Sequence, residues 1–75
     1  MTYHDLVMEA MHADPGRTWT AGELTQIIYP ELQMGTKQYQ ARVGTLHNVL
    51  KSAAKYKLVE LVGSGPRGHI WRLTE

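Results

Sequence analysis

The stretch LVELVGSGPRGHIWRL, residues 58–73, decides the fold, because it has the pattern of a β-hairpin. Two apolar segments flank a loop that contains Pro66, three glycines and a single charge, on Arg67. Glycine tolerates the positive φ values that a tight loop needs. The sequence therefore predicts a hairpin with a flexible basic tip over residues 63–68. Alternation turns one face of this hairpin toward a core, and that face consists of Val59, Leu61, His69, Trp71 and Leu73.

Length and composition predict one small domain that spans residues 1–75. The chain has no cysteine, which excludes disulfides and thiolate metal sites and is compatible with a reducing cytoplasm. It has neither the basic start and apolar run of a signal peptide nor the roughly 20 apolar residues of a membrane span. We therefore expect a soluble, cytoplasmic protein with no membrane partner.

A first helix is predicted at residues 3–12, where Thr2 can cap the first turn and Asp5 follows at the third position. The turn at residues 14–16 contains proline and glycine, so the chain reverses there. A short strand around Trp19 is then expected to join the hairpin. The apolar stripe of the first helix consists of Tyr3, Leu6, Val7, Ala10 and Met11.

A second helix is predicted to begin at Ala21, after a capping box formed by Thr20 and Glu23. It should end near residue 29, because Pro30 disfavours helical geometry in the residue before it. Residues 30–35 form a linker, which Leu32 and Met34 are expected to anchor to the core.

A third helix is predicted at residues 36–55, capped by Thr36. Gly44 weakens such a helix. Either the helix tolerates this glycine and is continuous, or the glycine marks a kink or a break after which the functional helix starts. The buried stripe consists of Tyr39, Val43, Leu46, Leu50 and Ala54. Together with the hairpin, the three helices predict an α+β domain whose core contains Leu6, Ala10, Trp19, Leu24, Ile28, Val43, Leu46, Leu50, Val59, Trp71 and Leu73.

Charge is distributed unevenly along the chain. Residues 1–34 carry a net charge of −4 and residues 35–75 carry +5, with no acidic residue between Glu31 and Glu60. An ordinary solvated helix gains from acid–base pairs four residues apart, so an acid-free third helix favours a polyanion as partner over simple solvation. The polar face of that helix gathers Lys37, Gln38, Ala41, Thr45, Asn48, Ser52 and Lys55, with Arg42 and Lys51 on its flanks.

These residue types suit a DNA groove. Asn and Gln can hydrogen-bond the edge of adenine, Thr and Ala can contact the methyl group of thymine, and Lys and Arg reach phosphates or guanine. The same side chains are also ordinary surface residues, so the pattern by itself leaves a solvated face as the alternative.

The segments TWTAGELTQII, TLHNVLKSAAKYKLVEL and HIWRLTE together resemble the winged helix-turn-helix superfamily of DNA-binding domains. The resemblance covers nearly the whole chain, and it departs from the common pattern at Lys57, where a glycine often precedes the wing. It implies three helices and a C-terminal β-hairpin wing. The third helix then enters the major groove through Lys37, Gln38, Thr45 and Asn48, the second helix contacts a phosphate at Thr20, and the wing reaches DNA through Arg67.

The predicted function is therefore sequence-selective binding of double-stranded DNA by a small transcriptional regulator. We expect a monomer or a weak homodimer that pairs on DNA half-sites. The alternative is a winged helix that binds another protein as an adaptor or subunit.

Catalytic and metal chemistry find little support in the sequence. GSGPRG lacks the GK[ST] ending of a phosphate-binding loop, and Ser64 has no evident base. His4, His12, His47 and His69 form no close pair on one helical face. We therefore expect neither an enzyme nor a metal site, and no cofactor.

Overall fold

Three helices and one three-stranded antiparallel sheet make up the structure, a computed structural model that describes residues 2–74. The α+β class and the predicted helix ranges are confirmed, each to within a residue. The elements in chain order are α1 (Tyr3–His12), β1 (Thr18–Trp19), α2 (Ala21–Ile28), α3 (Lys37–Lys55), β2 (Val59–Gly65) and β3 (Gly68–Leu73).

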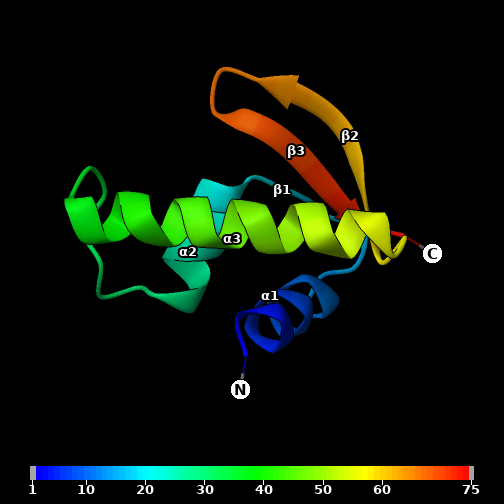
Figure 1. Ribbon diagram of the computed structural model, residues 1–75, viewed down its shortest axis with the longest axis horizontal. Coiled ribbons are helices and arrows are strands. Elements are labelled where there is room, and N and C mark those ends of the chain that lie inside the picture. The colour runs from blue at the N-terminus through cyan, green and yellow to red at the C-terminus, as the bar shows by residue number, and fades with distance from the viewer. Residues whose placement is uncertain (1, 75) are drawn as a thin grey trace.

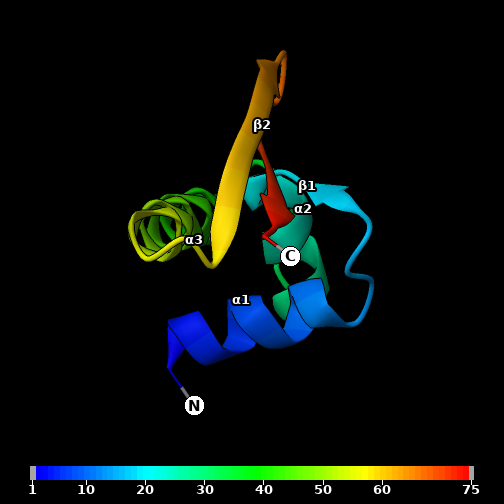
Figure 2. The same ribbon diagram turned by 90° about the vertical axis from the view of Figure 1, so that its right-hand side faces the viewer.

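The long helix α3 runs across the whole view in Figure 1, with the hairpin above it, α1 below it and α2 behind it. The β2–β3 hairpin projects from one side, α1 crosses the opposite side, and α2 packs beside α3. Viewed almost along α3, the hairpin rises away from all three helices (Figure 2). One long face of α3 and the tip of the hairpin are thereby left open.

The sheet has the strand order β1-β3-β2, so the short strand around Trp19 joins the hairpin as predicted. Trp19 pairs with Trp71, and Leu61 pairs with Trp71 from the other side. A register shift between Leu61 and Gly63 marks a β-bulge at Val62. The bulge adds twist to the outer half of the hairpin.

The hairpin loop is shorter than the predicted range of residues 63–68. Strand β2 continues to Gly65 and β3 begins at Gly68, so the turn consists of Pro66 and Arg67. Gly68 has a φ of 106°, which non-glycine residues rarely adopt, whereas Gly63 takes part in the strand pairing. The prediction was wrong in extent because glycines inside a strand have the same sequence signal as glycines in a loop.

Only the base of the hairpin contributes to the core. Val59, Trp71 and Leu73 are buried there, whereas Leu61 is 51% exposed and His69 is exposed. The predicted alternation is correct for Leu61, which pairs with Trp71. This part of the hairpin nevertheless extends beyond most of the helices, so its inner face is only partly covered, by the contact of His69 with His47 of α3.

The core includes seven of the eleven predicted residues and several that were not predicted. Contrary to the prediction, Ala10, Ile28 and Val43 are half-buried at its margin, and Leu6 is half-buried. On α1 the side that meets the core is centred on Val7 and Met11, which leaves Leu6 and Ala10 half-buried at its edges and Tyr3 exposed. The core consists of Val7, Met11, Trp19, Ala21, Leu24, Leu46, Leu50, Ala53, Val59, Trp71 and Leu73.

The helix caps follow the predictions with one exception. Thr2 and Asp5 form a reciprocal capping box, with both hydrogen bonds at 3.2 Å. At α2 only half of the box forms, because the Thr20 hydroxyl accepts from the Glu23 amide at 3.2 Å, while the Glu23 carboxylate does not reach the Thr20 amide. That carboxylate instead accepts hydrogen bonds from the Thr20 hydroxyl and from Arg17.

The linker and the middle of α3 correct two further expectations. Leu32 is half-buried, but Met34 is 68% exposed and accepts a hydrogen bond from Gln26 instead of entering the core. Helix α3 continues without interruption through Gly44, so the kink or break considered there does not occur.

Candidate nucleic-acid interface

One exposed stripe runs along the whole length of α3. It consists of residues that recur at intervals of four, three, four, three and four, which places them on one side of a helix. Lysines occupy its ends, and its centre contains small side chains and one asparagine. In order along the helix, the outer stripe is Lys37, Ala41, Gly44, Asn48, Lys51 and Lys55, all of them exposed.

The flank of α3 that faces α1 holds other predicted site residues, and it is less accessible. Arg42 is half-buried, donates a hydrogen bond to the Tyr3 hydroxyl, and lies 5.5 Å and 5.4 Å from the ring centroids of Tyr3 and Tyr29. These contacts tie α1 and the end of α2 to α3, so the Arg42 guanidinium is occupied within the fold. Thr45 is half-buried, and its hydroxyl donates to the Ala41 carbonyl at 3.0 Å.

Gln38 and Ser52 complete the predicted set on this helix. Both are exposed, on the part of the polar face nearer to the Arg42 flank than to the hairpin. The structure thus places seven of the nine predicted α3 positions on an exposed surface with a lysine at each end, and leaves Arg42 and Thr45 half-buried.

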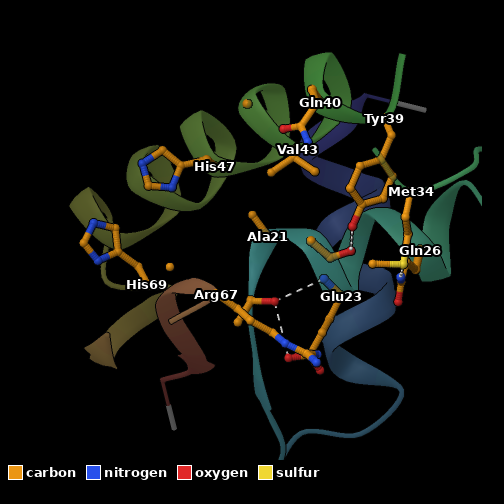
Figure 3. A pocket seen from close by; sticks show the side chains of 14 residues that line it. Ala21, Glu23, Gln26, Met34, Tyr39, Gln40, Val43, His47, Arg67 and His69 are labelled. Carbon is orange, nitrogen blue, oxygen red and sulfur yellow. Dashed lines mark hydrogen bonds between the residues drawn. The ribbon is translucent and has the colours of Figure 1, made fainter. Parts of the chain in front are cut away.

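A groove of about 570 Å³ separates α3 from the hairpin and from the start of α2 (Figure 3). Two of the predicted site residues, Thr20 and Arg67, line it, but none of the predicted α3 residues does. Helix α3 lines the groove with Gly44 of the outer stripe and with residues on the side of the helix next to that stripe, and β3 lines it with the residues that follow the turn. These residues are Tyr39, Gln40, Val43, Gly44 and His47 from α3, and Gly68 and His69 from β3.

The wall formed by α2 is fixed by a close contact with α3. The Tyr39 hydroxyl donates to the Gly22 carbonyl at 3.1 Å, and a Cβ atom at Gly22 would lie only 3.1 Å from that hydroxyl. A glycine at this position therefore lets the first turn of α2 approach α3 closely. The contact holds the Thr20 cap at the rim of the groove.

An aromatic cluster closes the end of the groove at the hairpin. The rings of His47 and His69 stack with their centroids 5.6 Å apart and their planes 18° from parallel (Figure 3). Trp71 contacts both rings edge-on, at 6.1 Å and 6.2 Å. Because Trp71 is buried, it holds the two imidazoles in place and couples the hairpin to α3.

Charge in and around the groove is mainly basic. Arg67 extends from the hairpin tip, and Lys51 follows His47 by one turn on α3. Glu23 is the acidic residue of the groove wall, and it is engaged by Arg17, whose guanidinium lies 3.0 Å from its carboxylate and 4.2 Å from the Trp19 ring centroid. The remaining positive potential therefore belongs to α3 and the hairpin.

Gln40, Gly44 and His47 line this groove but were not predicted as site residues. With Lys51 they recur at intervals of four, three and four, which is a detectable helical edge. No sequence signal indicated that His69 lines the groove, because its contact with His47 joins a residue of a strand to a residue of a helix.

Within residues 2–74, no group of three or more histidine, cysteine or acidic side chains has the arrangement of a metal site. No helix in that range is long and apolar enough to cross a membrane. No protein-family model matches the chain, and neither the curated proteins nor the solved structures contain a significant match.

Proposed function

We propose that this chain is a winged helix-turn-helix module that binds double-stranded DNA, with α3 in the major groove and the β2–β3 hairpin as the wing. The observation that carries the proposal is the outer stripe of α3, which has lysines at both ends, small residues at its centre and no acidic residue. The module acts as a small transcriptional regulator. It binds as a monomer or as a weak homodimer that pairs on DNA.

The dimensions of the outer stripe support this proposal. Lys37 and Lys51 are 14 residues apart, or about 21 Å along a helix, whereas the major groove is about 12 Å wide. Lysines at that spacing can contact phosphates on both sides of the groove. Between them, Ala41 and Gly44 allow the helix backbone to approach the bases, and Asn48 can hydrogen-bond a base edge.

The other two predicted contacts lie beside the same surface. Thr20 caps α2 and lines the groove, but it is buried and its hydroxyl is bonded to Glu23, so a phosphate near this helix start would meet the backbone amides of the first turn and the positive end of the helix dipole instead of the Thr20 side chain. Arg67 occupies a two-residue turn at the end of a hairpin that extends beyond the helices. A duplex lying along α3 could therefore be contacted from three elements at once.

A salt titration of binding to a mixed-sequence duplex tests the proposal. Arg42 is engaged by Tyr3 and Tyr29, which leaves Lys37, Lys51, Lys55 and Arg67 as phosphate contacts. Four such contacts give a slope of log K against log salt of about −3 to −4. A flat salt dependence, or no binding at a salt concentration of about 50 mM, would exclude this function.

A pair of matched variants separates local contacts from net charge. Lys51→Gln should reduce the magnitude of the slope by about 0.9, because it removes one phosphate contact. Lys57→Gln removes the same charge from a residue just beyond the end of α3 and should leave the slope unchanged. Equal effects of the two variants would show that binding depends only on total charge.

Sequence selectivity is tested at the centre of the outer stripe. Asn48→Ala should cost about 1 to 3 kcal/mol on the preferred site and little on random DNA, whereas Arg67→Ala should weaken both to a similar degree. The preferred site is first selected from a random duplex library. Equal losses on both duplexes for Asn48→Ala would show that α3 docks in another register.

A second candidate function, docking to another protein, is favoured by the hairpin. Leu58, Leu61 and Val62 are exposed large apolar residues, and β2 is the edge strand of the sheet. Such edges pair with strands of other chains. Absence of duplex binding at low salt would favour this candidate.

A further inference from the structure

His47 and His69 are the two aromatic polar residues at the hairpin end of the groove, and the DNA contacts proposed above do not use them. His47 is half-buried and His69 is exposed, so solvent and ligands can reach the pair. Within residues 2–74 neither imidazole takes part in a hydrogen bond, and their ring planes are held nearly parallel against the edge of Trp71.

We propose that His47 and His69 form a phosphodiester-binding site at the junction of α3 and the hairpin, which takes up protons when a backbone phosphate of the duplex occupies it. The inference rests on the proposed DNA-binding function and adds regulation by pH to it. Stacked imidazoles that are both protonated repel one another, and a phosphate beside them supplies the compensating negative charge. Occupancy by phosphate and protonation of the pair therefore favour each other.

The charged neighbours of the pair are consistent with an anion site. Arg67 lines the same groove from the hairpin tip, and Lys51 lies one turn beyond His47 on α3. Glu23, on α2, is the acidic residue of the groove wall, and its carboxylate is engaged by Arg17 and the Thr20 hydroxyl. A phosphate at the histidines is thus attracted by basic residues from two elements.

The site should make DNA binding depend on pH in the range where histidine titrates, about pH 5 to 8. Uptake of one or two protons on binding predicts that affinity for a duplex falls by about 10- to 100-fold per pH unit at the steepest part of the curve. No such dependence follows from lysine and arginine contacts, because these side chains stay charged over this range.

The experiment measures the affinity for one fixed duplex between about pH 6 and about pH 8, at constant ionic strength, by fluorescence anisotropy. The double variant His47→Gln with His69→Gln keeps polar side chains but cannot be charged, so its affinity should vary with pH far less than that of the wild type. The single variant His69→Gln alters an exposed residue and should retain an intermediate dependence.

The matched control is the double variant His4→Gln with His12→Gln, which removes two histidines from α1, on the opposite side of the molecule from the hairpin. It should keep the full pH dependence of the wild type. If the groove variant and this control retain the same pH dependence, the histidine site is excluded while the DNA-binding function stands. If the wild type binds no duplex at either pH, both are excluded.

Discussion

Lys57 has an unfavourable backbone conformation at the point where α3 ends. Its φ is 63°, in the left-handed region that favours glycine. The two hydrogen bonds of a Schellman motif impose this conformation, because the Leu58 amide donates to the Ala53 carbonyl and the Lys57 amide to the Ala54 carbonyl, both at 3.0 Å. A glycine would adopt this backbone conformation without the steric cost that Lys57 bears.

Lys57→Gly should therefore raise the free energy of unfolding by about 1 kcal/mol, since glycine adopts a positive φ without steric cost. Urea denaturation followed by circular dichroism measures the change. Lys51→Gly, in the interior of the same helix, is the control and should lower stability by about 1 kcal/mol. Destabilisation by both variants would show that the conformation at Lys57 is not strained.

Asp5 gives a second prediction at the scale of a single residue. Its pKa lies below the usual 3.8, chiefly because the Thr2 amide donates to its carboxylate and secondarily through the Thr2 side chain. A lowered pKa in the folded state means that ionised Asp5 stabilises the fold above pH 3.8, and that this contribution is lost as the pH falls through the lower folded-state value. Wild type should thus be more stable than Asp5→Asn at neutral pH.

Urea midpoints of the two proteins, compared from about pH 6 down to about pH 2, measure this effect. The difference between them should shrink as the pH falls below 3.8. A difference that stays constant over the whole range would show that the capping box forms equally well with a neutral side chain.

At the scale of elements, the sequence predicted the buried side of α3 and most of its exposed side, but not which flank of the helix a neighbouring element covers. Its buried side was correct at Tyr39, Leu46 and Leu50, because apolar spacing reports which side of a helix faces a core. The polar side has two flanks that look alike in sequence. Packing of α1 covers the flank of Arg42 and leaves the edge of His47 open, and sequence periodicity has no information about such a neighbour.

The variant Gly44→Ala tests whether DNA contacts the outer stripe of α3. A Cβ atom there would meet nothing within 4 Å, so Gly44→Ala should stabilise the protein by up to about 1 kcal/mol through helix propensity alone. If bases lie against this position, the added methyl group should also weaken duplex binding. Thermal melting and duplex titration of the same variant measure both effects. Stabilisation with unchanged affinity would show that DNA does not approach α3 at Gly44.

At the scale of the whole molecule, the individual helices, caps and hairpin were largely predicted correctly, whereas the way in which they pack against one another was largely not predictable from the sequence. The helices, the caps and the hairpin all have local signals in residue spacing. The stack of His47 on His69 and the fit of Gly22 under Tyr39 depend on how α2, α3 and β3 pack together. The groove arises from these long-range contacts, so the sequence could indicate Thr20 and Arg67 as DNA contacts but not that they line one groove with His47 and His69.

Stability of the whole domain should depend on a few buried side chains. A domain of 75 residues has a free energy of unfolding of about 4 to 11 kcal/mol. Leu46 is fully buried where α3 meets the core, so Leu46→Ala should cost about 2 to 5 kcal/mol, a large part of that free energy. Leu61 lies on the same apolar face of the hairpin as the core residues but beyond the cover of the helices. Leu61→Ala should thus cost about 1 kcal/mol or less. Chemical denaturation of the two variants compares a leucine inside the core with one beyond it, and equal losses would show that the outer half of the hairpin folds back onto the helices.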